Sequence, residues 1–275
     1  MKPIKILVTN QKGGVGKSTI AANLAAYLSI QNTGPVSLID FDKQSSSAKW
    51  AEKAPDIGLN IFNPKIKFDQ SGGLVLAEAK RYLNQYSLNC EISVSDLTWT
   101  YTMSPEFMLE FDIILIPSAI SKFEMASSEI FILEYIHRYL SKIKINKQLI
   151  LVVPSRVDKS FNPEQKFLNL ISIDGCSITP PIHFIPAIDS FIYEDFLCVS
   201  TNQEIADNFI SFGQYIAELV NQKIKQKQNS DNTLNGVERL NNLTVLEQFR
   251  NDQKNKKEKE MSKTKKWIPS FLMKS

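Results

Sequence analysis

The sequence predicts an α/β protein in which a mostly parallel sheet carries helices on both faces. The run Ile4–Thr9 is apolar and β-branched, as is typical of a buried parallel strand, and Asn10–Gly16 follows it as a glycine-rich turn. Apolar residues then recur at helical spacing in Lys17–Gln31, and Val36–Asp40 is a second apolar strand. Strand, helix and strand within about 35 residues indicate one βαβ unit, whose crossover should be right-handed.

Later segments continue this alternation, which favours a parallel sheet covered on both faces. The predicted helices are 72–87, Glu124–Leu140 and Asn202–Lys225. The predicted strands are Glu91–Leu97, Phe111–Pro117, Leu149–Pro154 and a short run at His183–Pro186.

The C-terminal part of the chain carries the basic charge. Residues 223–275 contain 13 Lys and Arg against 6 Asp and Glu, whereas the whole chain has 32 against 29. Apolar residues also become sparse there, and Asn, Gln and Lys dominate. We therefore expect one packed domain over residues 1–225 and a basic, flexible or loosely helical tail over 226–275.

Cysteine usage and hydropathy favour a cytoplasmic protein. Cys90, Cys176 and Cys198 are widely spaced and form no CxxC pair, so reduced thiols are expected. His137 and His183 are isolated, which argues against a zinc site. No apolar run approaches the ~20 residues of a membrane span, and no signal peptide opens the chain.

The strongest motif is a glycine-rich run at the predicted strand-to-helix turn. It reads Lys12-Gly13-Gly14-Val15-Gly16-Lys17-Ser18-Thr19. Glycines let backbone N–H groups close around a phosphate, and the following helix adds its positive end. Lys17 would reach the β- and γ-phosphates, while the Ser18 hydroxyl would ligate Mg²⁺. The run predicts an ATP-binding, Mg²⁺-dependent P-loop ATPase; the alternative is a chance glycine-rich loop before a helix.

The run departs from the strict P-loop at Gln11, which stands where that pattern has glycine. In this form it resembles the deviant P-loop of the ParA/MinD ATPases, in which a signature lysine precedes the first paired glycine. Lys12 holds that position. The resemblance implies an ATP-dependent homodimer in which Lys12 reaches the partner's phosphates, as an arginine finger would. It also implies that the nucleotide is bound by Gln11, Lys12, Gly13, Gly14, Val15, Gly16, Lys17, Ser18 and Thr19.

In that interpretation Lys12 and Lys17 are also catalytic, and the alternative for Lys12 is a solvated loop charge.

Two acids end the second strand, in Asp40-Phe41-Asp42-Lys43-Gln44. This segment is similar to the family's Asp-x-Asp-Pro-Gln switch, with Lys43 replacing proline. The resemblance implies that Asp40 positions the attacking water and that Asp42 supports the switch and the metal. Alternatively, both acids cap a strand-to-loop turn.

The family also expects an aspartate at the end of an apolar strand, where it helps to hold Mg²⁺. Asp96 is the best match and would act alongside Ser18. Asp112 competes, but it begins its strand and so should lie at the wrong edge of the sheet. A surface carboxylate is the alternative for Asp96. Should Asp96 not hold the metal, the chain would be a regulator that binds ATP with negligible hydrolysis.

Three further features resemble this family. Arg156 lies in Ser155–Asp158, which resembles the segment near the nucleotide base, as does Ile185–Ala187. Trp50 resembles the small ParA proteins, which also lack an N-terminal DNA-reading extension. Together these features predict plasmid or chromosome partition, with an ATP-bound dimer on non-specific DNA, a ParB-like adaptor that stimulates hydrolysis, and a nucleoid-associated location.

Two observations complicate this prediction. Ala187–Gln222 contains no Lys or Arg, so any DNA-binding charge must lie elsewhere. The tail supplies it through Lys254, Lys256, Lys257, Lys259, Lys263, Lys265 and Lys266. Lys265–Lys274 also combines cations with Trp267 and Phe271, which favours a MinD-like peripheral membrane attachment as the alternative. Pro269 argues against a regular helix there, so a partner-docking peptide is equally compatible, and a simply solvated tail is the plainest interpretation.

Overall fold

A single parallel sheet organises the protein. The computed structural model describes residues 2–31, 34–66, 72–100, 102–137, 148–160 and 175–229. Its eight described strands run in the order β3-β2-β4-β1-β5-β6-β7, with β8 paired to β6, and each pairing is parallel. The strands are β1 (Ile4–Asn10), β2 (Val36–Asp40), β3 (Asn60–Phe62), β4 (Ile92–Thr98), β5 (Ile113–Ser118), β6 (Leu149–Val157), β7 (Cys176–Ile178) and β8 (Ile182–His183).

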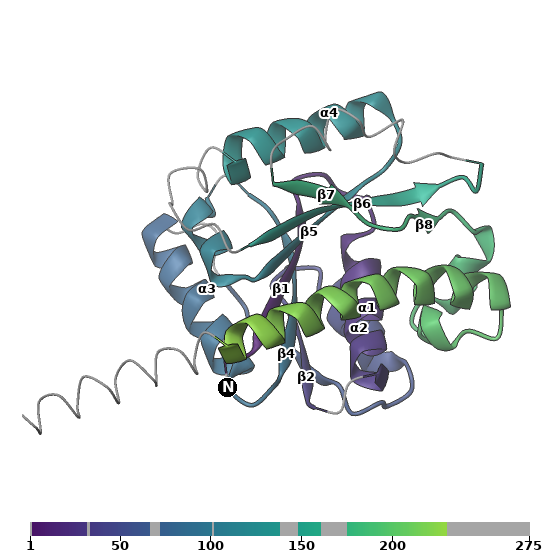
Figure 1. Ribbon diagram of the computed structural model, residues 1–275, viewed down its shortest axis with the longest axis horizontal. Helices are drawn as coiled ribbons and strands as arrows, with labels where there is room; N and C mark the ends of the chain where they lie inside the picture. The colour runs from purple at the N-terminus through teal and green to yellow at the C-terminus, as the bar shows by residue number, and fades with distance from the viewer. Residues whose placement is uncertain are drawn as a thin grey trace, which may run out of the picture. The chain divides into compact units, whose positions relative to one another are not determined.

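Helices cover both faces of this sheet (Figure 1), as the sequence predicts. The α-helices are α1 (Lys17–Gln31), α2 (Ser46–Lys53), α3 (Gly72–Ser87), α4 (Lys122–Phe131) and a last one over residues 203–229. Shorter turns are the 3-10 helices η1 (Pro105–Glu110), η3 (Pro186–Phe191) and η4 (Leu197–Val199) and the π-helical turn η2 (Ile132–His137).

Each face of the sheet has its own apolar core. Alternate strand residues such as Ile6 and Leu38 pack with α1, α2 and the last helix, whereas Leu7 and Ile39 pack with α3 and α4. Helix α1 is buried almost all round, because α2 and the last helix cover the side that faces away from the sheet. The sequence pattern had predicted only one buried face for it.

Most predicted elements agree with the structure, and the differences lie at ends and in short pieces. The helix 72–87 is present with the predicted bounds, and β4 continues beyond Leu97 to Thr98. The helix predicted over Glu124–Leu140 ends at Phe131 and gives way to η2; residues 138–140 lie outside the described chain. Helix α2 and strands β3 and β7 were not predicted, because pieces of three to eight residues carry little periodicity.

The chain divides into two units, Met1–Ile224 and Lys225–Ser275. Of the predicted tail, residues 230–275 lie outside the described chain, so its proposed DNA and membrane contacts stay predictions. Among the helices that are described, none combines the length and the apolar character that crossing a membrane would require.

Candidate nucleotide site

The glycine-rich loop lies between β1 and α1, at the carboxyl edge of the sheet. Gly14 and Gly16 adopt φ of 75° and 89°, a left-handed conformation that favours glycine. The loop is also held from β6: the Ser155 hydroxyl donates to the Val15 carbonyl at 2.7 Å, and the Arg156 guanidinium donates to the Gly14 carbonyl at 3.0 Å. These bonds keep the loop in the curved form that a phosphate cradle needs.

Lys17 is the buried cation of this loop. Its side chain is 6% exposed, and its Nζ donates to the Lys12 carbonyl at 2.7 Å. An ammonium has three donors, so this bond leaves capacity for phosphate oxygens. Burial lowers the pKa of Lys17, while the nearby charges of Asp96 and Asp42 raise it. A cation desolvated in this way is strongly attracted to an incoming anion.

A cavity of about 490 Å³ opens beside the loop, within the size range of small-molecule pockets. The loop side of the cavity is formed by Gly13, Gly14, Gly16, Lys17, Ser18, Thr19 and Ile20. Further lining comes from the end of β6, from β8 with the two residues after it, and from η3, namely Ser155, Arg156, Ile182, His183, Phe184, Ile185, Ile188 and Asp189. Asp42, Gln44, Ser46, Thr98 and Ile192 complete the lining.

The part of the lining between Ile182 and Ile192, called the apolar wall below, is mainly apolar. It includes four isoleucines between residues 182 and 192, and Phe184, whose side chain is 57% exposed. An apolar wall facing a phosphate cradle suits a nucleotide whose planar base packs there. Of the predicted base-side residues, Ile185 lies on this wall and Arg156 lines the cavity beside the loop, whereas Phe184 and Ile188 had not been predicted as binding residues.

The remaining predicted loop residues have different surroundings. Lys12 is exposed and its side chain lies outside the cavity lining. Gln11 is half-buried, and Val15 is buried with its carbonyl bonded by Ser155. The backbone N–H of Lys12 donates to Asn10 Oδ1 at 3.1 Å, which ties the loop to the end of β1. The structure thus groups Lys17, Ser18 and Thr19 at the cavity and leaves Lys12 facing outward.

Asp40 has a different environment from the predicted one. It is fully buried and does not line the cavity. Its Oδ2 accepts from the Ser47 hydroxyl at 2.8 Å and the Ala48 amide at 3.0 Å, and its Oδ1 accepts from the Asp42 amide at 2.9 Å. Burial raises the pKa of Asp40, and these hydrogen bonds lower it. Asp40 therefore caps the first turn of α2, since the Ser45 side chain makes no capping bond.

Asp42 is the acid of this strand-end pair that lines the cavity. Its two oxygens accept from Thr98, one from the amide at 2.8 Å and one from the hydroxyl at 2.7 Å. These bonds orient the carboxylate from the end of β4. Asp42 thus lines the cavity and Asp40 does not, which differs from the expected placement, and the catalytic role of either acid stays a prediction. Strand alternation could have revealed Thr98, which lies two residues beyond Asp96 and so on the same face.

Asp96 lies in β4, paired in register with Val8 on one side and Asp40 on the other. It is fully buried, and neither carboxylate oxygen has a hydrogen-bond partner. The pKa of Asp96 is raised to about 7, mainly by burial and then by the charges of Asp40 and Asp42, although the nearby hydroxyls of Ser18 and Ser47 lower it. A buried carboxylate without a partner is costly unless a cation compensates it.

These surroundings fit Mg²⁺. P-loop proteins hold this ion with a loop hydroxyl, a carboxylate and the phosphates themselves. Ser18 and Asp96 would supply the protein ligands here. Within the described residues, no group of three or more His, Cys, Asp and Glu is arranged to hold a metal, which is compatible with a site completed by phosphates. The competitor Asp112 precedes β5, at the other edge of the sheet, and accepts from the Lys5 amide at 2.9 Å.

A family comparison agrees with this geometry. The family model for the CobQ/CobB/MinD/ParA nucleotide binding domain matches residues 6–265. The chain belongs to this family. It is thus a nucleotide-binding protein of ParA/MinD type, as the loop predicted.

One curated relative is maintenance of carboxysome distribution protein A of Gloeobacter kilaueensis. It is 34% identical over an alignment of 102 positions, and the match covers 34% of this chain and 46% of that protein. The chain thus spans about half the length of the curated relative it matches.

Several solved structures share the fold. A plasmid partition protein of Borrelia burgdorferi bound to AMPPNP has a TM-score of 0.59 at 20% identity, covering 79% of this chain and 99% of that one. A Cyanothece McdA variant in complex with ATP has a TM-score of 0.62 at 18% identity, covering 78% and 97%. The cell division ATPase MinD of Pyrococcus furiosus has a TM-score of 0.60 at 15% identity, covering 80% and 100%.

The buried charge of Asp96 leads to a prediction on stability. The pKa of Asp96 is raised from 3.8 to about 7 in the folded protein, so the unfolded chain ionises first as pH rises. Wild-type stability should therefore fall between about pH 4 and pH 7 relative to Asp96→Asn. The variant should be more stable by about 4 kcal/mol above pH 7 without ligand.

Urea unfolding at several pH values measures this difference. Adding Mg²⁺ with ATP should stabilise the wild type more than the variant, because only the carboxylate attracts the metal. A difference in stability that does not change with pH would contradict the assignment.

Proposed function

We propose that this chain is a Mg²⁺-dependent ATPase that dimerises on binding ATP and positions DNA, as in plasmid or chromosome partition. The observation that carries the proposal is the buried pair of Lys17 and Asp96 beside the glycine loop. Lys17 has donors to offer to phosphates, and Asp96 has two oxygens without partners. A nucleoside triphosphate with its metal would give Lys17 an anion to bind and Asp96 a cation to bind. Neither phosphate nor metal alone would do both.

The metal, when bound, would neutralise charge on the β- and γ-phosphates. Ser18 and Asp96 would hold it, and Lys17 would bind the same phosphates from the loop. Asp42, oriented by Thr98, would position the attacking water and accept its hydrogen bond. Hydrolysis would give ADP and phosphate.

Lys12 supports the dimer. Its side chain is exposed and lies outside the cavity of its own chain, so it does not serve its own phosphates in this arrangement. In a dimer whose two loops face each other, it would reach the partner's γ-phosphate as a second cation. A homodimer would thus complete each site.

Partition of DNA follows from the family and from charge. Partition proteins are among the structural relatives, and the basic tail from Lys254 to Lys266 offers phosphate neutralisation. A ParB-like adaptor would stimulate hydrolysis and release, and the protein would be cytoplasmic and nucleoid-associated.

A MinD-like peripheral membrane protein is the second candidate. The specific observation in its favour is the end of the chain, where Lys265 and Lys266 precede Trp267 and Phe271. Cations with aromatic and aliphatic side chains are the combination that binds an anionic membrane surface.

Separate substitutions of Asp40 and Asp42, the two acids at the end of β2, test the mechanism. Asp42→Asn should lower the rate of ATP hydrolysis by about 100-fold with ATP binding retained, because the base that orients water is removed. Asp40→Asn should instead lower the free energy of unfolding by about 1–3 kcal/mol, because its single accepting oxygen cannot serve Ser47 and Ala48 on one side and the Asp42 amide on the other.

Phosphate release and urea unfolding, measured on both variants, separate these outcomes. A stable Asp40→Asn protein without hydrolysis, beside a fully active Asp42→Asn protein, would return the catalytic role to Asp40.

Co-sedimentation separates DNA from membrane as the surface that is bound. With ATP, the full chain should pellet with DNA. Replacing Lys254, Lys256, Lys257 and Lys259 by Gln should weaken this binding by at least tenfold, since fewer DNA phosphates are then neutralised. Trp267→Ser with Phe271→Ser should leave DNA binding unchanged. Pelleting with anionic liposomes that the Trp267 and Phe271 changes abolish, with no DNA binding, would instead select the membrane candidate.

A further inference from the structure

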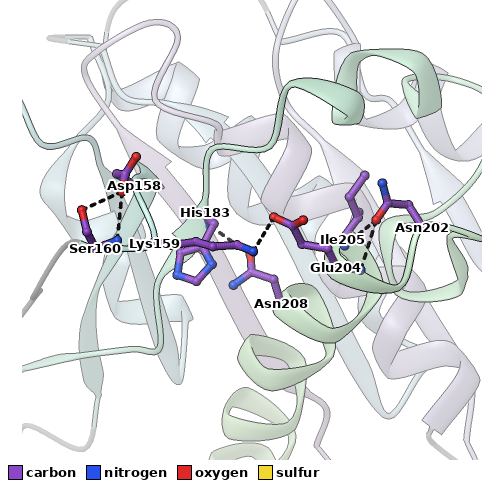
Figure 2. A network of polar contacts seen from close by, with 8 residues as sticks. All are labelled: Asp158, Lys159, Ser160, His183, Asn202, Glu204, Ile205 and Asn208. Carbon is purple, nitrogen blue, oxygen red and sulfur yellow. Dashed lines mark hydrogen bonds and ion pairs between the residues drawn. The ribbon is translucent and has the colours of Figure 1, made fainter.

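The side chain of Asn208 hydrogen-bonds to the edge of β8 that faces away from β6, and β8 begins the apolar wall of the cavity. Asn208 Oδ1 accepts from the His183 amide at 2.9 Å, and Asn208 Nδ2 donates to the Pro181 carbonyl at 3.0 Å. Figure 2 shows Asn208 beside His183, reaching it from the last helix. Both atoms of one side-chain amide are thus used on one strand.

This pair of bonds imitates a neighbouring strand. In a parallel ladder, one residue accepts from the amide of residue i+1 and donates to the carbonyl of residue i−1 of the strand beside it. The primary amide of Asn208 does the same around Ile182, with its carbonyl and its NH₂ group. The other edge of β8 is bonded to β6, where the Phe184 amide donates to the Val157 carbonyl at 2.8 Å. The short strand is therefore held from both sides.

The helix that carries Asn208 is held in place by core packing. Ile205, Phe209 and Phe212 of this helix are buried in the core that α1 also joins. Gly213 lies so close to α1 that a Cβ there would be 2.6 Å from the Tyr27 ring. At the start of the helix, Asn202 Oδ1 accepts from the amides of Glu204 and Ile205, as Figure 2 shows. Asn208 thus projects from a well-anchored element.

The strand that Asn208 holds also lines the cavity. Ile182, His183 and Phe184 lie on the apolar wall of the cavity, whereas Asn208 is not among the residues that line it. From this we infer that Asn208 is a positioning residue, which sets the place of the wall on which the nucleotide base packs. It would thereby govern affinity for the nucleoside part of the ligand and not for its phosphates. The inference rests on the proposed function, in that the ligand is ATP.

Two substitutions and two ligands test this inference. Asn208→Ala and Asn208→Leu both remove the paired bonds, and Leu keeps the side-chain volume and favours the helix. Each should raise the Kd for ATP by about tenfold, because the wall loses the bonds that hold it. The Kd for inorganic triphosphate, which has no base, should stay the same in both variants, as calorimetric titration of the full chain would measure.

Glu204 provides the matched control on the same helix. Its carboxylate pairs with Lys159 at 2.8 Å, also drawn in Figure 2, but both side chains are largely exposed, so the pair is expected to contribute little. Glu204→Gln should leave both Kd values at the wild-type level. An unchanged Kd for ATP in the Asn208 variants overturns the inference, and so does an equal loss of affinity for ATP and triphosphate. A wild-type chain that binds triphosphate but not ATP would instead overturn the proposed function itself.

Discussion

The buried charges at the glycine loop constrain the rest of the structure. A Lys17 ammonium and an Asp96 carboxylate, both removed from water, carry a desolvation cost that a bound phosphate and a cation would offset. The parallel sheet makes this arrangement possible, because β1, β2 and β4 all end at the same edge and bring Asp42, Asp96 and the loop together. Apolar cores on both faces supply the stability that such a site uses.

Helix α2 connects the two halves of the site. Its first turn is capped by Asp40, two residues before Asp42, the acid that lines the cavity. Further along, the Trp50 indole donates to the Asp195 carbonyl at 2.9 Å, and the Trp50 ring packs edge-on against Tyr193. Tyr193 follows Ile192 of the base wall. Helix α2 thus contacts both the segment that carries Asp42 and the segment that follows the apolar wall.

The sequence predicted the elements that local pattern determines. The glycine loop, the first βαβ unit and the helix over 72–87 depend on composition and spacing within a short window, and all three are present. Asp96 and Asp112 also lie at the different positions expected from strand direction, and the metal-binding role of Asp96 stays a prediction. What could not be predicted depends on contacts between distant segments. Asp40 turns out to cap α2, and Asn208 binds a strand about 25 residues earlier, which no periodicity encodes.

The central claim is that Lys17 binds the phosphates of a nucleotide. Calorimetric titration of ATP with Mg²⁺ into the wild type, Lys17→Ala and Lys12→Ala tests it most directly. Lys17→Ala should lose measurable binding, because the buried cation contacts the phosphates within its own chain. Lys12→Ala should bind ATP as a monomer, because on the proposed dimer arrangement the exposed Lys12 would reach the partner's site and not its own. Unchanged ATP affinity in Lys17→Ala would contradict the account.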